Sequence, residues 1–367
     1  MKFTITRNNL FTALQKISPL FVKNQSYPIL ENVLLNIKDN TLFLTSCNLE
    51  IEIIITVPVH YTYNSGSGLV SGKKLLDICR NIPNNSMLEI KKYENKINII
   101  SENSFFSLIT LNSNIFPNLR NFKSTNKFSI SQNVLKNMIN STHFAIANQD
   151  VRYYLNGMLL EIQKNNIRTI TTDGYRMAIC TISINTYILY CAIIIPKKSI
   201  IELARLLGNN QSLSKVFIGE NNIQIHLENV IFTSKLISGN YPNYKQVLLN
   251  NPIKIIEIDL LLFKASLLRV SVLSHEQFKG VHLYLNNNQL EISSSNQNEE
   301  EAKEIIPLIF SKKINFEMNI NVNYILDVLN VLKSKNIIFF IQKCASKLQL
   351  TDNEHSSVFY IIMPLHL

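Results

Sequence analysis

The residue types that usually perform catalysis are present, but their spacing does not form a catalytic site. The seven histidines are scattered, and the five cysteines include no CxxC pair. The signatures of a nucleophile elbow, a phosphate-binding loop, a zinc protease and a dinucleotide fold are missing. Residues 65–68 read as a flexible turn, and residues 299–301 form a run of charge rather than a spaced acid and base. We therefore expect no enzyme, no metal site and no cofactor.

The basic residues are the remaining candidates for function. The chain has 36 lysines and arginines against 26 acids, for a formal net charge of +10 and an isoelectric point near 9.2. This balance favours a nucleic-acid partner, because lysine and arginine neutralise phosphates and release counterions. The chain is also rich in Asn, Ile and Lys, as expected from A+T-rich codons. Such a codon bias would add lysine throughout the chain, whatever its function. The location of the charge must decide between the two interpretations.

An internal repeat defines the organisation of the chain. Three short segments share one pattern of apolar positions around an acid, and the three acids, Asp77, Glu202 and Asp327, lie 125 residues apart. A second helical pattern precedes each segment, and each unit ends near a proline in an apolar context. The six predicted helices cover residues 7–17, 73–80, 132–143, 197–206, 259–270 and 323–335.

Short alternating or Ile- and Val-rich runs between the helices predict strands. The best runs are 41–55, 157–162, 168–172, 281–285 and 337–341. Each unit is then expected to have two helices and about eight strands in the order αββββαββββ, which makes it an α+β domain. The predicted domains are residues 1–125, 126–253 and 254–367.

The predicted helices carry nearly all of the net charge of +10, although they are under a fifth of the chain. A codon bias that added lysine throughout the chain would not concentrate the charge on the helices. This concentration favours one basic face made from helices, with a solvated helix face as the structural alternative.

The whole chain resembles the bacterial DNA polymerase III beta subunit, the replicative sliding clamp. The segments that carry the resemblance, in order, are residues 149–159, 172–176, 278–281, 324–330 and 363–367. The family fold implies three repeated clamp domains with inner helices and outer antiparallel sheets. Two chains are expected to close head-to-tail into a ring around duplex DNA.

The resemblance implies DNA contacts that neutralise phosphates without reading bases. By position, the candidates in the channel are Lys73, Arg80, Lys197, Lys198, Arg205, Lys264 and Lys333, with Arg7 and Lys136 as weaker ones. Gln149, Tyr153 and Tyr154 are expected on a loop at the ring face, where an exposed aromatic pair can stack on bases unless one ring packs inward. Relatives often carry Arg where this chain has Asn24.

The resemblance also implies an apolar cleft between the second and third domains that binds short linear motifs of partner proteins. The partners would be the polymerase III catalytic subunit, the clamp loader, other polymerases and repair proteins. The matching positions are Arg152, Leu155, Thr172, Gly174, Tyr175, Arg176, Met177, Pro242, Val247, Asn321, Tyr324, Ile361, Met363, Pro364, Leu365 and Leu367. Methionines suit a groove that adapts to several ligands. Tyr175, Gln246 and His366 replace the usual His, Arg and Arg, so the polar rim and the motif preference are expected to differ.

Ring closure is expected to join the first domain of one chain to the third of the other. An apolar centre would pair Phe106 and Leu108 with Val272 and Leu273. At the rim, Lys74 would approach the acidic run that includes Glu300, Glu301 and Glu304. Asn103 and Phe105 stand where basic residues are expected, so apolar area would replace some of the ion pairing.

The leading hypothesis is thus a homodimeric processivity factor that binds DNA without sequence preference and tethers polymerase. The alternatives are a basic nucleic-acid enzyme and a monomeric repeat scaffold for protein partners only.

No apolar run approaches the roughly 20 residues that span a bilayer, and the amino terminus lacks the apolar centre of a signal peptide. These features predict a soluble protein of the cytoplasm.

Overall fold

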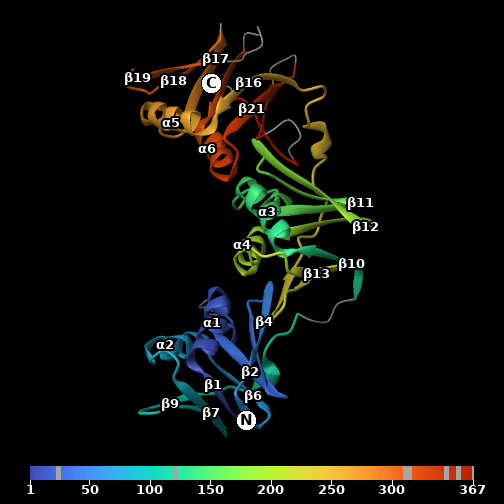
Figure 1. Ribbon diagram of the computed structural model, residues 1–367, viewed down its shortest axis with the longest axis vertical. Helices are drawn as coiled ribbons and strands as arrows, with labels where there is room; N and C mark the ends of the chain where they lie inside the picture. Colours follow the sequence, from blue (N-terminus) through green and yellow to red (C-terminus); the bar gives the residue numbers. More distant parts are fainter. Residues whose placement is uncertain are drawn as a thin grey trace. The chain divides into compact units, whose positions relative to one another are not determined.

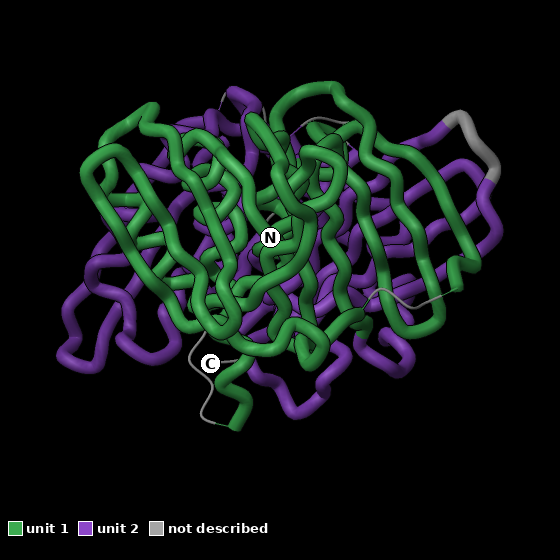
Figure 2. The backbone as a smooth tube through the Cα atoms, turned by 90° about the horizontal axis from the view of Figure 1, so that it is seen from below, with its two compact units in different colours: residues 1–136, 201–236 green, residues 137–200, 237–367 purple. Residues whose placement is uncertain are grey.

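The computed structural model describes residues 1–21, 26–119, 123–286, 288–308, 316–342, 347–352 and 357–365. The backbone divides into two compact units, shown in different colours in Figure 2. The first unit comprises residues 1–136 and 201–236, and the second comprises residues 137–200 and 237–367. None of the described helices is long and apolar enough to cross a membrane.

Three repeats follow one another along the chain, each with a strand, a helix, a set of strands, a second helix and three final strands, and the set between the helices differs in number (Figure 1). The first repeat runs through β1 (Lys2–Thr6), α1 (Arg7–Ile17), β2 (Asn32–Lys38), β3 (Thr41–Cys47), β4 (Ile51–Pro58), β5 (Tyr61–Asn64), β6 (Gly66–Ser71), α2 (Gly72–Asn81), β7 (Met87–Tyr93), β8 (Lys96–Ser101) and β9 (Ser104–Ile109). The second contains β10 (Ser124–Ser131), α3 (Gln132–Thr142), β11 (Gly157–Thr172), β12 (Arg176–Pro196), α4 (Lys197–Leu206), β13 (Leu213–Gly219), β14 (Asn222–His226) and β15 (Val230–Lys235). The third contains β16 (Ile253–Asp259), α5 (Leu260–Val270), β17 (Gly280–Asn286), β18 (Gln289–Ser295), β19 (Glu301–Pro307), β20 (Phe316–Asn321), α6 (Val322–Val331), β21 (Asn336–Ile341), β22 (Leu348–Thr351) and β23 (Val358–Ile362).

The six helices are confirmed, but the expected order of strands was wrong. One strand precedes the first helix of each repeat and three follow the second. The strand β1, β10 or β16 leads directly into its helix because its last residue, Thr6, Ser131 or Asp259, accepts a hydrogen bond from a main-chain amide in the first helical turn. The two strands expected at 157–162 and 168–172 are one long strand, β11.

Helix α6 is shorter than the sequence predicted. It ends at Val331, and the main-chain N–H of Leu332 bonds to the carbonyl of Val328 before the chain turns into β21. Lys333 and Lys335 therefore lie after the helix and not on it. The buried apolar residues of α6 and α5 face the same core, where the rings of Phe263 and Phe339 meet edge to face at 5.2 Å.

Main-chain ladders join successive repeats. Strand β15 of the second repeat pairs antiparallel with β4 of the first, which makes one sheet in the order β10-β13-β14-β15-β4-β3-β2-β6. Strand β23 of the third repeat pairs antiparallel with β12 of the second, in the sheet β11-β12-β23-β22-β21-β16. The other two sheets have the orders β5-β1-β7-β8-β9 and β19-β18-β17-β20. Strands β9 and β19 each occupy an edge of their sheet.

Candidate functional site

A cleft with a volume of 180 Å³ opens where β11, β12 and the segment after Tyr241 meet the end of β23, all within the second unit. Its surface is mainly apolar. The lining residues are Arg152, Tyr154, Leu155, Thr172, Gly174, Arg176, Met177, Pro242, Asn243, Tyr244, Val247, Ile361 and Met363. A cavity of this character suits apolar side chains held by a few polar groups.

Tyr244 forms a fixed wall of the cleft. Its hydroxyl donates a hydrogen bond to Oε2 of the buried Glu161 at 2.6 Å, and the Arg168 guanidinium lies 3.3 Å from the same oxygen. Burial, followed by the hydrogen bond to Glu161, raises the pKa of Tyr244 to about 12. The phenol therefore stays protonated and its ring stays in place.

A tight turn before β12 forms another part of the cleft. Gly174 has a φ of +95°, a conformation that L side chains rarely adopt, and a Cβ there would meet the Arg152 guanidinium at 3.1 Å. Asp173 Oδ1 accepts hydrogen bonds from the amides of Tyr175 and Arg176 at 3.0 and 3.1 Å. The turn is therefore built from Asp173 and needs glycine at 174.

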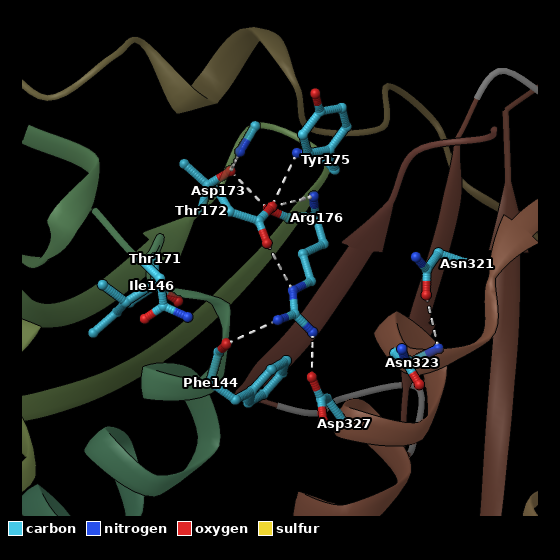
Figure 3. Close-up of polar contacts among 12 residues, drawn as sticks. Phe144, Ile146, Thr171, Thr172, Asp173, Tyr175, Arg176, Asn321, Asn323 and Asp327 are labelled. Carbon is cyan, nitrogen blue, oxygen red and sulfur yellow. Dashed lines mark hydrogen bonds and ion pairs between the residues drawn. The ribbon is translucent and has the colours of Figure 1, made fainter. Parts of the chain in front are cut away.

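Arg176 connects this turn to the third repeat (Figure 3). Its guanidinium donates to Asp173 Oδ2 at 3.0 Å, to Asp327 Oδ2 at 2.5 Å and to the Phe144 carbonyl at 3.0 Å. The ring centroids of Tyr324 and Phe144 lie 4.7 and 5.4 Å from its central carbon. Only 13% of the Arg176 side chain is exposed, so most of it is enclosed by protein groups.

The second arginine of the cleft, Arg152, is also paired. It makes two hydrogen bonds to Asp150, Nε to Oδ1 at 3.0 Å and Nη2 to Oδ2 at 2.9 Å. The hydrogen bonds from Arg152 lower the pKa of Asp150 to about 2. Both arginines that line the cleft are thus neutralised by carboxylates, so its interior favours an apolar ligand over an acidic one.

Ten of the residues predicted for the cleft line it, and three further residues do so as well. Asn243 and Tyr244 belong to the segment that the repeat had marked around Pro242. Tyr154 was expected to contact DNA, but it lines the cleft and packs on the apolar cluster that contains Leu159. Of the tyrosine pair expected at the DNA, Tyr153 is exposed and Tyr154 is half-buried.

The other residues predicted for the cleft lie around it or beyond what the structure describes. Tyr175 is exposed at the turn, and its carbonyl accepts a hydrogen bond from the Met363 amide at 2.9 Å. Tyr324 packs against Arg176, and Asn321 caps the start of helix α6. The main chain of Leu365, which follows Pro364, bonds to Asn319. Asn24, His366 and Leu367 fall outside the described residues.

The basic residues predicted for DNA divide into exposed and bonded groups. Lys73, Lys198 and Lys333 are exposed, and Lys264 is half-buried. The exposed Arg80 and Arg205 form ion pairs with Asp77 and Glu202 on their own helices. Lys197 donates to the Ile146 carbonyl at 3.0 Å and to Asn148 at 2.6 Å, and burial lowers its pKa. Gln149 lies exposed in the next turn, with a positive φ.

The expectation that Arg7 lines a channel was wrong. Its side chain is 8% exposed and donates to the carbonyls of Cys79 and Arg80, at the end of α2. Lys136 similarly donates to the Leu207 carbonyl after α4 at 2.9 Å. Cations at these helix ends satisfy carbonyls that have no partner within the helix.

The residues predicted for the dimer contact lie on or beside the two edge strands. Phe106 and Leu108 are half-buried on β9, Phe105 is exposed on the same strand, and Asn103 is exposed in the turn before it. Val272 and Leu273 follow helix α5, with Val272 77% exposed. Lys74, Glu300 and Glu301 are exposed. Glu304 already forms an ion pair with Arg269 of its own chain, and this pair lowers the pKa of Glu304.

Comparisons with known proteins agree with this architecture. Models of the DNA polymerase III beta subunit match the chain in three parts: its N-terminal domain at residues 1–120, its central domain at 129–243 and its C-terminal domain at 245–366. The beta sliding clamp of Buchnera aphidicola subsp. Acyrthosiphon pisum is 43% identical, and that of Escherichia coli K12 is 39% identical, each over the whole of both chains. The crystal structure of a sliding clamp from Pseudomonas aeruginosa bound to griselimycin matches with a TM-score of 0.96 at 34% identity, with both chains fully covered. The chain therefore belongs to the DNA polymerase III beta subunit family.

This family consists of processivity factors that do not catalyse a reaction themselves. The expected α+β fold of three repeated clamp domains is confirmed. The chain is a replicative sliding clamp, and its partners include DNA and polymerase.

Proposed function

We propose that two copies of the chain close head-to-tail into a ring around duplex DNA. The observation that carries this proposal is the pattern of the sheet junctions. The last strand of the second repeat pairs with a strand of the first (β15 with β4), and the last strand of the third pairs with a strand of the second (β23 with β12). The last strand of the first repeat, β9, and the third repeat's β19 remain as edges. An antiparallel pair between β9 of one copy and β19 of the other would repeat the same junction and close the series.

Apolar side chains support this contact. Phe105 and Ile109 on β9 and Ile305 on β19 are exposed, although apolar edge strands favour pairing with another chain. Phe106, Leu108, Val272 and Leu273 form the proposed centre of the contact, with Lys74, Glu300 and Glu301 at its rim.

We also propose domain boundaries at residues 125 and 253, since β10 and β16 begin at Ser124 and Ile253.

The proposed DNA contacts are electrostatic and independent of sequence. Lys73, Lys198, Lys264 and Lys333 would meet phosphates directly, while Arg80, Arg205 and Lys197 would contribute from side chains that are already bonded. Gln149 and Tyr153 would touch the strand at the ring face. Weak contacts of this kind suffice when a closed ring provides the retention, and they permit sliding.

The cleft is the proposed site for short apolar segments of the polymerase III catalytic subunit, the clamp loader and other replication and repair proteins. Its paired arginines and Met177 and Met363 support an apolar, adaptable ligand set. We also propose that griselimycin, which the Pseudomonas clamp binds, occupies this cleft. The protein would work in the cytoplasm, where the chromosome is replicated.

Retention on circular DNA tests the ring. The clamp is loaded by its clamp loader onto a nicked circular plasmid, and the complex is separated by gel filtration before and after the plasmid is cut once. Retention on the circle and release from the linear form are expected. Equal retention on both forms would overturn encirclement, and retention on neither would favour a scaffold that binds only proteins.

A further inference from the structure

The three acids that mark the sequence repeat do not have the same partners. On α2, Asp77 pairs with Arg80 at 2.7 Å, and on α4, Glu202 pairs with Arg205 at 2.8 Å. Both are pairs between residues three apart on one helix, which stabilise the helix itself. On α4, Arg205 also donates to the Lys16 carbonyl of the first repeat, so the contact between repeats there is made by the arginine and not by the acid.

The third acid has lost this partner and gained another. The position three residues after Asp327 is the exposed Asn330, which cannot form an ion pair. Asp327 Oδ2 instead accepts a hydrogen bond at 2.5 Å from Nη1 of Arg176, which lies 151 residues earlier in the chain (Figure 3). The same acid position therefore serves a contact between repeats and not within a helix.

Helix α6 fixes the plane of the Arg176 guanidinium through two residues. Asp327 binds one edge of the group, and Tyr324, one turn earlier on the helix, stacks on it with 4.7 Å between the ring centroid and the guanidinium carbon. Asp173 and the Phe144 carbonyl hold the remaining donors. Because Arg176 also lines the cleft, α6 determines how that wall is presented to a ligand.

We propose that Asp327 is a positioning residue for the partner-binding cleft. This inference rests on the proposed function of the cleft as a site for apolar segments. With Asp327 bound, Arg176 stays against α6 and its charge is compensated. Without Asp327, the Nη1 edge of the guanidinium is unpaired and Asp173 is the acid that remains paired with Arg176, so the group turns toward the cleft and places a donor without a partner where apolar side chains would bind. Linkage is reciprocal, so a ligand bound against Arg176 strengthens the hold of α6 on the turn at Asp173.

Griselimycin is the probe for the test, and its affinity is measured by calorimetry on the full chain. The Asp327→Asn variant is expected to bind about three- to tenfold more weakly, in the range of coupling between contacting side chains. Asp327→Glu is expected to restore binding to within about twofold, because a carboxylate can still reach the guanidinium. The matched variants at the other repeat acids, Asp77→Asn and Glu202→Gln, are expected to bind as the natural chain does.

Comparison of the three repeats suggests a second variant, which leaves Asp327 in place. Asn330→Arg introduces the arginine that the first two repeats carry, and the new side chain competes with Arg176 for Asp327. Weaker griselimycin binding is expected for Asn330→Arg and unchanged binding for Asn330→Gln. Natural affinity in both Asp327→Asn and Asn330→Arg would overturn the positioning role.

Hydrogen exchange of the unliganded protein separates this inference from the proposed function. The amides of Tyr175 and Arg176 are expected to exchange faster in Asp327→Asn than in the natural chain or Asp77→Asn, because the Asp173 turn loses its anchor. If griselimycin does not bind the natural chain, the cleft proposal fails for this ligand, and the exchange rates alone decide the role of Asp327. Unchanged exchange at these amides would count against it.

Discussion

Arg7 and Lys73 are both basic residues near the start of a helix in the first repeat, yet their surroundings assign them different roles. Arg7 is buried and satisfies two carbonyls at the end of α2, whereas Lys73 is exposed on that same helix. Sequence alone could not separate them, because both fit the count of basic helix residues. Burial in the folded chain distinguishes a cation that holds the fold together from one that is exposed to a charged partner.

Substitution of each residue should therefore affect different measurements. Arg7→Met is expected to lower the free energy of unfolding by about 1–3 kcal/mol, since the carbonyls of Cys79 and Arg80 lose a charged donor. Lys73→Ala is expected to leave stability within about 0.5 kcal/mol and to reduce the salt dependence of DNA binding by about one unit of slope. Urea unfolding and DNA titrations at several salt concentrations measure the two effects. A stable Arg7→Met chain with weakened DNA binding, or an unstable Lys73→Ala chain, would contradict this division of roles.

Tyr244 shows how a buried phenol makes stability depend on pH. Its pKa is raised from the ordinary value of 10 to about 12, so its contribution is complete below pH 10 and is lost as the pH rises toward 12. Between pH 10 and 12 the natural chain should therefore lose stability more steeply than Tyr244→Phe. Denaturant unfolding at successive pH values measures the difference. Parallel pH profiles would show that Glu161 and burial do not hold this proton.

At the scale of elements, the helices were predictable and the strands less so. Apolar periodicity and the 125-residue repeat located all six helices, because a helix is defined by its own local pattern. The end of α6 was missed because Lys333 and Lys335 fit a helix as well as a loop. The pairing of β15 with β4 and of β23 with β12 could not be predicted, since main-chain ladders between repeats leave no fixed signal in the side chains.

The edge strands give a direct test of assembly. Ile305→Asp places a charge on β19 at a side chain that is 52% exposed in a single chain, so the fold should survive while the proposed contact with β9 is lost. Sedimentation at micromolar concentration should show a monomer. Leu213→Asp is the control, because Leu213 is also exposed but lies on β13, an interior strand of its sheet. A dimer of the Ile305→Asp variant would contradict the assignment of β19.

The cleft was predicted from the resemblance more fully than from residue chemistry. Arg152, Arg176 and Met177 were expected in a cleft and line one, but the pairing of the two arginines with acids was not foreseen. Asp150 and Asp327 are ordinary acids in the sequence, and only the folded chain brings each to its arginine. The neutral character of the cleft is therefore a property of the structure.

On the scale of the whole molecule, the two kinds of partner should respond differently to salt. DNA binding releases counterions from phosphates, so raising salt from about 50 to 200 mM should weaken it by orders of magnitude. Griselimycin binding in the cleft should change by less than about twofold, because both arginines are already compensated. Parallel titrations on one preparation compare the two. Equal salt sensitivity would show that an unpaired charge contributes to binding in the cleft.

The junction between β15 and β4 also bears on how this sequence can evolve. Main-chain amides and carbonyls make that joint, and any residue other than proline supplies them. A lineage under strong mutational bias can therefore exchange most side chains along such seams without separating the repeats. Selection would then fall mainly on the few positions whose chemistry cannot be replaced, such as Gly174, Asp173 and Arg176.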